Sequence, residues 1–293
     1  MRNITIITDS TCDLTKDILD KYQIRVLPLG VTFPDEPDKV YQDGIDINSS
    51  LIYEHVDKTG VLPKTSAVNV GQFMQVFEEE LGKGNDVFFT GIGSGLSSSF
   101  NNARLAAQDF PEDRIAIVDS QNLSTGVGII AVKAALMKEE GKTLEEIKAE
   151  AERIVPLIST KFCIDRLDYL HKGGRCSGMT KLVAHAFKIH PVAHVKDNNL
   201  SVYKMPRGKY IKAVETQIDE FMDDLPYIDK SCVFITHSGH MDGIEDYCFE
   251  KMKDYLPEGN LHITQAGSTI SSHCGPKTIG LLYIVDKPKS EEK

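Results

Sequence analysis

The sequence predicts an α/β protein with two α/β domains, the first built on a mostly parallel sheet and the second on a mixed sheet. Short apolar runs end in polar turns that open helices, as at residues 4–22 and 86–107, and this alternation is typical of parallel sheets. Farther along, two short apolar segments flank the turn at Asp197–Asn199 and indicate an antiparallel pair. The length of 293 residues suffices for one large or two ordinary domains.

Composition indicates a folded globular protein and argues against several classes of partner. The formal net charge is −10 and no Lys/Arg cluster is present, so we expect neither a nucleic-acid nor an anionic-membrane surface. The apolar run Ile4–Ile7 is too short for a signal peptide and no later stretch approaches a membrane span. We therefore expect no integral membrane segment and a cytoplasmic location. Six cysteines without a C-x-x-C pair favour reduced thiols over disulfides or structural zinc.

The first strand, Ile4–Ile7, runs into the polar turn Thr8–Asp13 and then a helix at Lys16–Tyr22. Asp9 in this turn either fixes a neighbouring loop by accepting N–H bonds or caps its own turn. The next elements follow from apolar runs, Pro/Asp-rich breaks and capping residues. In order, they are strands at 25–29, 31–33 and around 40–41, a helix from the cap Asn48 to near Gly60, an extended segment at 62–69 and a helix at 70–81.

The stretch 86–103 is predicted to contain the functional site of the protein. A buried strand is followed by three turn-forming glycines and by Ser97, which caps a helix that stops at Phe110–Pro111. The N–H groups and positive end of this helix, with three serine hydroxyls, form an anion site that needs no Lys or Arg. The alternative is a merely solvated Ser/Gly loop. The glycines are Gly91, Gly93 and Gly95, and the serines are Ser97, Ser98 and Ser99.

Two further polar segments bear on this site. In an open parallel sheet, the turn at Thr8–Asp13 and the glycine-rich turn lie along one edge, so we expect them to face a shared crevice. Thr65 and Ser66 precede the helix at 70–81, where a Thr-Ser pair is often only a local cap.

The helix predicted at 124–139 contains a formal G-x-G-x-x-A match that begins at Gly126. A dinucleotide site requires the first glycine in the strand-to-helix turn, whereas Gly126 lies within the helical pattern. Small residues that pack this helix onto a sheet explain the match better. A strand at 114–118 precedes this helix, and a helix at 143–155 follows it and ends at Pro156. We place the domain boundary there, which gives domains 1–157 and 158–293.

The second domain is expected to combine strands and helices in a mixed order. A strand at 160–164 leads into a helix at 167–172, which the double glycine Gly173–Gly174 stops. The remaining elements are a short helix around 184–187, strands at 192–195 and 200–203, a helix from Arg207 to Asp223, a strand at 233–236, a helix at 243–255, strands near 261–264 and 280–285, and a loose tail at 287–293.

Histidines in the second domain suggest one site residue and no metal centre. The run from His237 to Asp242 resembles a metal-binding segment, but it lies in a strand-to-helix turn without a companion His/Asp cluster. Three other histidines, His185, His190 and His194, share neither helical nor strand spacing. His273 is framed by small hydroxyl residues and a Gly-Pro turn, so it is either a structural histidine or a donor to an anion.

Together these segments resemble the DegV family, the fatty acid-binding subunits of bacterial fatty acid kinase. The resemblance runs almost end to end and depends on the order and spacing of six motifs. They are Thr8–Leu14, Thr65–Ser66, Ser94–Ser97, Val118–Ser120, Leu170–Arg175, and Gly267–Ser268 leading to His273–Pro276. The family's fold implies two α/β domains with a ligand cleft between them.

The resemblance implies that the chain holds a long-chain fatty acid in an apolar tunnel and needs no other cofactor. The carboxylate would meet the hydroxyls of Thr65 and Ser97 and the N–H of Ser98, and His273 would reach it from the second domain. Three departures from the family pattern stand at Ser98, at Ala67–Val68 and at Lys277, where glycine, Gln-Pro and glycine are usual. Lys277 near the head group would either pair with the carboxylate or narrow the entrance.

The resemblance further implies that the protein is a carrier, not an enzyme. A separate ATP-dependent kinase subunit would phosphorylate the bound carboxylate to an acyl phosphate, and Arg175 and Arg207 lie in motifs similar to the family's kinase-facing surface. Two other hypotheses remain. One is a Ser/His hydrolase or acyltransferase that uses Ser97 and His273. The other is a phosphate or nucleotide binder, although no Lys-Ser/Thr follows the glycines as a P-loop requires.

Overall fold

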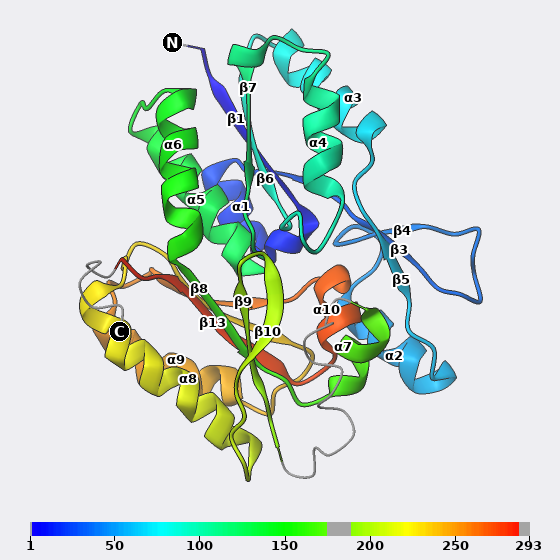
Figure 1. The fold of residues 1–293 in the computed structure, drawn as a ribbon, viewed down its shortest axis with the longest axis vertical. Helices are drawn as coiled ribbons and strands as arrows, with labels where there is room; N and C mark the ends of the chain where they lie inside the picture. Colours follow the sequence, from blue (N-terminus) through cyan, green and yellow to red (C-terminus); the bar gives the residue numbers. More distant parts are fainter. Residues whose placement is uncertain (1, 175–188, 287–293) are drawn as a thin grey trace.

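The computed structural model describes residues 2–174 and 189–286 and has the predicted α/β architecture (Figure 1). Four parallel strands form the sheet of the N-terminal part, in the order β2-β1-β6-β7. Their bounds are β1 Ile4–Asp9, β2 Arg25–Leu27, β6 Asp86–Gly91 and β7 Ile115–Asp119. Every residue of β6 is buried, as expected for a central strand covered on both faces.

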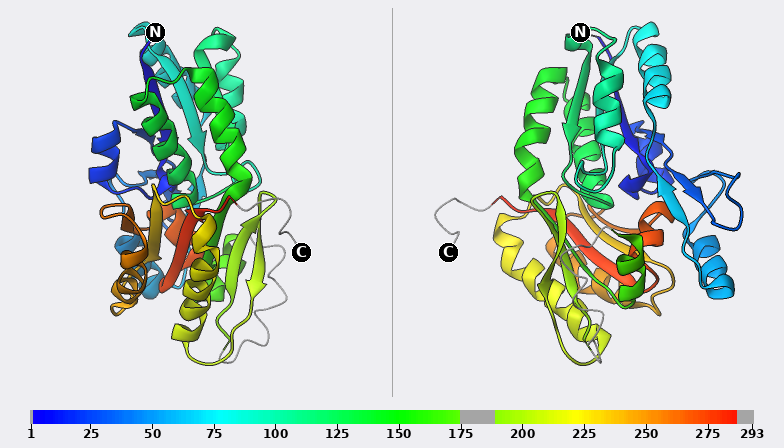
Figure 2. Two further views of the ribbon diagram at one scale, coloured as in Figure 1. Left: turned by 90° about the vertical axis from the view of Figure 1, so that its left-hand side faces the viewer. Right: turned by 45° about the vertical axis from the view of Figure 1, so that its right-hand side comes forward.

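Helices cover both faces of this sheet (Figure 2). Helices α1 (Lys16–Tyr22), α5 (Thr125–Glu139) and α6 (Leu144–Ile154) pack on one face. Helices α3 (Val70–Gly82) and α4 (Ser99–Ala107) pack on the other. The carboxyl ends of β1 and β6 therefore meet at one edge of the sheet, as the sequence predicted.

A small antiparallel sheet, which the sequence did not predict as a unit, projects from the N-terminal part (Figure 1). Its order is β4-β3-β5, with β3 at Gly30–Thr32, β4 at Tyr41–Gln42 and β5 at Lys64–Ser66. Gly30 permits this pairing, because a Cβ atom there would collide with Ser66 and Val40. Helix α2 (Ser49–Thr59) and strand β5 both contact helix α10 of the C-terminal part. Thr65 of β5 therefore lies beside the C-terminal part.

The C-terminal part contains a six-stranded mixed sheet, as predicted, in the order β10-β9-β8-β13-β11-β12. Only β11 and β12 pair in parallel, and the other neighbours are antiparallel. Helices α8 and α9 cover one face. The bounds are β8 Ile158–Cys163, α7 Leu167–Gly173, β9 Val192–Lys196, β10 Asn199–Lys204, α8 Tyr210–Asp224, β11 Val233–Ser238, α9 Ile244–Met252, β12 Leu261–Gln265, α10 Ser268–Cys274 and β13 Thr278–Ile284.

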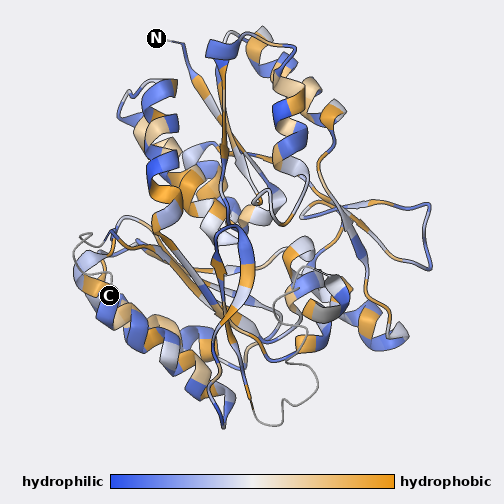
Figure 3. Cartoon of the chain, in the orientation of Figure 1, coloured by the Kyte–Doolittle hydropathy of each residue, from blue (hydrophilic) through white to orange (hydrophobic). Residues whose placement is uncertain are grey.

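Helix α5 lies between the two large sheets and belongs to a core cluster with residues of both. Its hydrophobic residues are visible in Figure 3. A Cβ atom at Gly126 would lie 2.8 Å from Thr160 Oγ1 of β8, and one at Gly128 would lie 2.7 Å from Leu14 Cδ2. The two glycines thus allow α5 to pack closely against β8 on one side and against Leu14 on the other. This packing role agrees with the prediction that they do not form a dinucleotide site.

Several boundaries differ from the prediction. Helix α8 starts at Tyr210 instead of Arg207, because Gly208 has a φ of 116° that interrupts the helix. Helix α10 was not predicted, since its hydroxyl-rich sequence has low intrinsic helix propensity. The helix expected at 184–187 and the tail at 287–293 lie outside the described residues. The division into domains 1–157 and 158–293 stays a prediction.

Two absences concern only the described ranges. No helix among residues 2–174 and 189–286 is long and apolar enough to cross a bilayer. Five cysteines in those ranges are free and buried, and Cys176 lies outside them.

We expect Gly128→Ala to lower the free energy of unfolding by about 1–3 kcal/mol, because the added methyl overpacks the site against Leu14 and the Cys12 carbonyl. Urea denaturation measures the change. Gly82→Ala is the matched control, since that position at the end of α3 faces open space and alanine there should be neutral or slightly stabilising. Equal effects of the two substitutions would contradict the close packing of α5 at Gly128.

Candidate functional site

Two of the predicted site residues meet where α10 packs beside β5. His273 Nε2 lies 2.9 Å from Thr65 Oγ1, although the two residues are 208 positions apart in the chain. Gly173, at the end of α7, lets that helix approach the imidazole, because a Cβ atom there would lie 2.5 Å from His273 Nδ1. The double glycine of the Leu170–Arg175 motif therefore both stops a helix and makes room for the His273 ring.

Helix α10 is held by two buried carboxylates of the N-terminal part. Asp43 accepts the N–H groups of Ser268 at 2.7 Å and Thr269 at 3.2 Å. Asp13 accepts the N–H of Gly267 at 2.8 Å. A helix of seven residues is not stable alone, and its first N–H groups need acceptors. These two carboxylates therefore fix the helix that carries His273, a role that nothing in the local sequence pattern indicates.

Asp13 also joins α10 to the start of α5. The Ser124 hydroxyl lies 2.6 Å from its second carboxyl oxygen and donates to it when the carboxyl group is ionised. Burial raises the pKa of Asp13 to about 8, so near neutral pH the protonated form predominates. In that form one oxygen still accepts from Gly267 while the other donates to Ser124. Ser124 lines the apolar cavity described below. Asp13 therefore positions both α10 and the start of α5, which border the site.

Asp9 stabilises the glycine-rich turn, which was one of the two predicted roles. Its carboxylate accepts the Ile92 N–H at 2.9 Å and the Thr11 N–H at 3.1 Å. Burial raises the pKa of Asp9 to about 6. Gly91 is required here, because a Cβ atom at that position would collide with the Asp9 carboxylate.

The first of two adjacent cavities, the head cavity, has an empty volume of about 490 Å³, which includes open solvent, and opens beside the Thr65–His273 pair. Among the described residues, its polar lining is Thr65, Ser66, Ser97, Thr269 and His273, and the other described lining residues are apolar. The Ser97 hydroxyl accepts the Ser99 N–H at 3.3 Å. Ser98 is exposed, and it takes the N-cap position of α4 that the sequence assigned to Ser97.

The start of this helix offers fewer free N–H donors to an anion than the sequence predicted. Internal acceptors already take the N–H groups of Ile92, Ser94, Ser97 and Ser99. The turn is only partly solvated, since Gly91 and Gly93 are buried whereas Gly95 and Ser98 are exposed. The predicted hydroxyls of Thr65 and Ser97 nevertheless line one cavity with His273.

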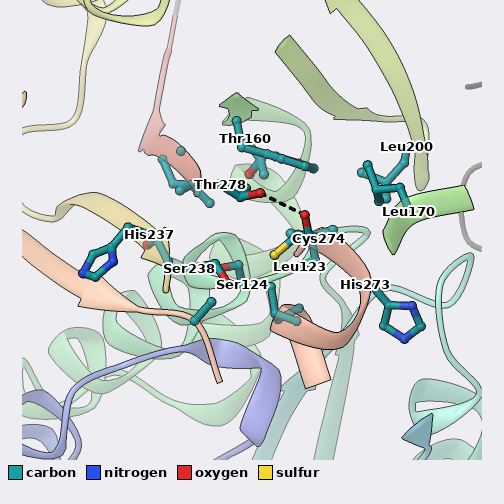
Figure 4. A pocket seen from close by; sticks show the side chains of 16 residues that line it. Leu123, Ser124, Thr160, Leu170, Leu200, His237, Ser238, His273, Cys274 and Thr278 are labelled. Carbon is teal, nitrogen blue, oxygen red and sulfur yellow. Dashed lines mark hydrogen bonds between the residues drawn. The ribbon is translucent and has the colours of Figure 1, made fainter. Parts of the chain in front are cut away.

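The second cavity, the tail cavity, has an empty volume of about 520 Å³ and is apolar (Figure 4). Its floor is one face of the mixed sheet. The floor residues are Thr160 and Phe162 of β8, Thr278, Gly280 and Leu282 of β13, and Thr236 and Ser238 of β11. The threonine hydroxyls are engaged elsewhere, for example Thr160 with Asn122 at 2.7 Å and Thr278 with the Cys274 carbonyl at 2.9 Å. They therefore add little polarity to the cavity surface.

Among the described residues, four line both cavities: Leu123, Leu200, Ile270 and His273. A cavity with polar groups thus lies next to an apolar one, and the apolar cavity lies between α10, the start of α5 and the mixed sheet. Sequence reasoning did not identify the apolar lining, because such residues have the same pattern as an ordinary core.

The other predicted candidates lie away from the head cavity. Lys277 forms a 2.7 Å ion pair with Asp242, which lowers the pKa of that carboxyl, so the expected pairing of Lys277 with a ligand is not supported. Arg207 is exposed and pairs with Ile189 in an isolated β-bridge, and Arg175 lies outside the described residues.

The histidine-rich turn matches the interpretation as a turn. His237 Nδ1 lies 2.9 Å from the Gly239 carbonyl and His240 Nε2 lies 3.0 Å from Asp242. Across the described part of the chain, no group of three or more His, Cys, Asp or Glu side chains is arranged to hold a metal ion. His237 does line the tail cavity, which the sequence did not reveal; Figure 4 shows it on the side opposite His273.

Comparison with known proteins gives one consistent family. A family model described as "Uncharacterised protein, DegV family" matches residues 3–286. A DegV domain-containing protein of Clostridium perfringens is 31% identical over 286 residues, which cover 97% of this chain and 99% of the relative.

Solved structures give the same result. A DegV family protein of Thermus thermophilus, described by its fatty acid binding, is 30% identical with a TM-score of 0.87 over 98% of this chain and 100% of that one. DegV of Bacillus subtilis, described as a fatty acid binding protein, is 25% identical with a TM-score of 0.83 over the same shares.

We expect the free energy of unfolding to fall by about 2 kcal/mol between about pH 6 and pH 8, because folding raises the pKa of Asp13 from 3.8 to about 8. The folded state then binds the proton more tightly, so this stability is complete below the unfolded pKa and is lost as pH rises through the folded one. Urea denaturation across this range measures it.

Asp13→Asn should flatten that pH dependence and keep the fold, because an asparagine amide can donate to Ser124 and accept from Gly267 as protonated Asp13 does. The exposed Asp20→Asn is the control and should leave the slope unchanged. An unaltered slope in Asp13→Asn would assign the effect to another group.

Proposed function

The chain belongs to the DegV family, as its motifs predicted, and from that premise we propose that it binds a long-chain fatty acid in the adjacent head and tail cavities. The observation that carries the proposal is the adjacency of a cavity with hydroxyls and an imidazole and a second cavity with an apolar surface, which share lining residues. This division matches an amphipathic ligand with one polar end. The solved relatives described as fatty acid binding support the same ligand class.

The carboxylate is assigned to the hydroxyls of Thr65 and Ser97. His273 Nε2 contacts Thr65 Oγ1, so an N–H on this nitrogen donates to Thr65 and leaves the Thr65 hydroxyl proton for the ligand. Hydrogen bonds to a charged group are stronger than neutral ones. Without them a buried carboxylate would lose several kcal/mol and tend to protonate. In this arrangement His273 acts chiefly through Thr65, and the Ser98 N–H supplies a further donor.

The acyl chain supplies the affinity. Burying about sixteen carbons at about 0.8 kcal/mol per CH₂ gives a gross gain on the order of 12 kcal/mol, before the costs of ordering and association. The hydrogen bonds at the head group then contribute orientation more than affinity. Chain-length preference depends on how the lining of the tail cavity packs around the terminal methyl.

The geometry favours binding over hydrolysis. A serine nucleophile needs a hydrogen bond to its base. Within the described residues, the hydrogen bonds of the Ser97 hydroxyl go to Ser99, and His273 Nε2 contacts Thr65. This arrangement lacks the nucleophile–base contact that a Ser/His hydrolase or acyltransferase would need between Ser97 and His273.

The proposal extends to a partner. We infer that an ATP-dependent fatty acid kinase subunit phosphorylates the bound carboxylate to an acyl phosphate, and that this chain presents the ligand without performing the chemistry. Arg207 is exposed, as a residue that contacts a partner must be. It shares this proposed role with Arg175, and guanidinium groups suit phosphate or carboxylate contacts across an interface.

Thr65→Val and Ser97→Ala should each weaken fatty acid binding by roughly tenfold to a hundredfold, because each removes one hydrogen bond to a charged group. Titration with a fluorescent fatty acid measures the affinity, and native mass spectrometry identifies the co-purified ligand. Ser98→Ala is the matched control, since its hydroxyl is exposed and its N–H is retained. Unchanged affinity in both test variants would place the head group elsewhere. Protein with neither co-purified nor added lipid bound would refute the function itself.

Arg207→Ala should leave fatty acid affinity unchanged and reduce acyl-phosphate formation by the kinase at least about tenfold, as expected when a charged interface contact is lost. Both quantities are measured on the same preparation. The exposed Lys209→Ala, two residues away, is the control. A variant that loses lipid but keeps its turnover per bound lipid would show that Arg207 supports the cavity instead.

A further inference from the structure

The β9–β10 hairpin of the C-terminal part reaches the glycine-rich turn of the N-terminal part (Figures 1 and 2). Its tip is formed by Asp197 and Asn198, with φ values of 48° and 62°. This left-handed pair gives the tight two-residue turn that such hairpins favour, and asparagine tolerates it well. Within residues 2–174 and 189–286, the strand order makes β10 an edge strand that pairs with β9.

The tip is bound by a short polar network. Asn198 Nδ2 donates to Ser94 Oγ at 2.7 Å and to the Asp119 carboxylate at 3.3 Å. Ser94 is itself fixed, because its hydroxyl and its N–H donate to the same carboxylate at 2.6 Å and 3.0 Å. Ser94 and Asp119, which belong to two separate motifs, thus bind the hairpin tip together.

The glycines of the turn make room for this contact. A Cβ atom at Gly93 would lie 2.5 Å from Asn198 Oδ1, and one at Gly95 would collide with the Asn198 carbonyl. Neither glycine has a positive φ, so close approach and not backbone freedom explains their presence.

The hairpin is also a wall of the ligand cavities. Leu200, two residues after Asn198, lines both the head cavity and the tail cavity. It packs in a cluster with Leu96 and Leu123 of the N-terminal part. By contrast, the hairpin residues Lys196, Asp197 and Asn199 are exposed. Movement of the tip away from Ser94 would withdraw Leu200 and open the junction between the two cavities.

We propose that Asn198 is a positioning residue that latches the β9–β10 hairpin over the ligand cavity, and that release of this latch admits and releases the ligand. The proposal rests on the proposed fatty acid binding for the identity of the ligand. It goes beyond that function by naming the exchange route and the residue that controls it.

The test uses Asn198→Gly in the full chain, because glycine keeps the left-handed turn and removes only the side-chain latch. Dissociation of a preloaded fluorescent fatty acid, chased with excess unlabelled lipid, should be roughly tenfold faster than in the wild type, in line with the loss of two hydrogen bonds. The dissociation constant should change less, since association also becomes faster. Asn199→Ala in the same turn is the control and should match the wild type.

Gly95→Ala tests the latch from the other side and should speed dissociation in the same way, because the added methyl group would collide with Asn198. A second readout is independent of lipid: Cys274 lines the tail cavity and is buried, so a small thiol reagent should label it faster in Asn198→Gly, with Cys274→Ser identifying the signal. Dissociation and labelling rates equal to those of Asn199→Ala would overturn the proposal. The Asn198 contact would then only stabilise the hairpin and would not control ligand exchange. Faster labelling in a protein that binds no fatty acid would refute the proposed function and keep the latch.

Discussion

The site depends on two buried carboxylates that accept the first N–H groups of α10. Asp13 and Asp43 belong to the N-terminal part, whereas the helix they hold belongs to the C-terminal part. Isolated seven-residue helices are not stable in water, so these acceptors determine where α10 stands. His273 near the end of that helix then meets Thr65. The head cavity is therefore a consequence of contacts between the two parts and is not formed by either alone.

The same contacts explain why an apolar cavity persists at this junction. Helix α5 is buried against both large sheets, so the two parts share a core cluster. Near the tail cavity, however, small residues such as Gly280 and Ser124 leave the space between the sheet and α5 unfilled. An apolar concave space beside a few polar groups is a typical candidate for a ligand site.

The sequence predicted the layers of the fold better than the details of the site. Apolar runs such as residues 87–89 identified the parallel sheet, because a fully buried strand has a distinctive local pattern. Helix α10 was missed, since its stability comes from Asp13 and Asp43, more than 200 residues away, and not from its own propensity. The glycines at 93 and 95 were attributed to a tight turn, whereas their main partner is Asn198. Long-range contacts of this kind leave no periodic signal in a single sequence.

A ligand that touches both parts has a thermodynamic consequence. Thr65 and Ser97 come from the N-terminal part and His273 and Leu200 from the C-terminal part, yet all four line one cavity. An occupant contacts all of them only when the parts are closed together, so it binds the closed arrangement more tightly than any open one. By linkage, that difference in affinity stabilises the closed arrangement increasingly as the ligand concentration rises above its dissociation constant. A surface built from both parts would thus be best formed in the ligand-bound protein, which would give the proposed partner a physical means to distinguish the ligand-bound form from the empty one.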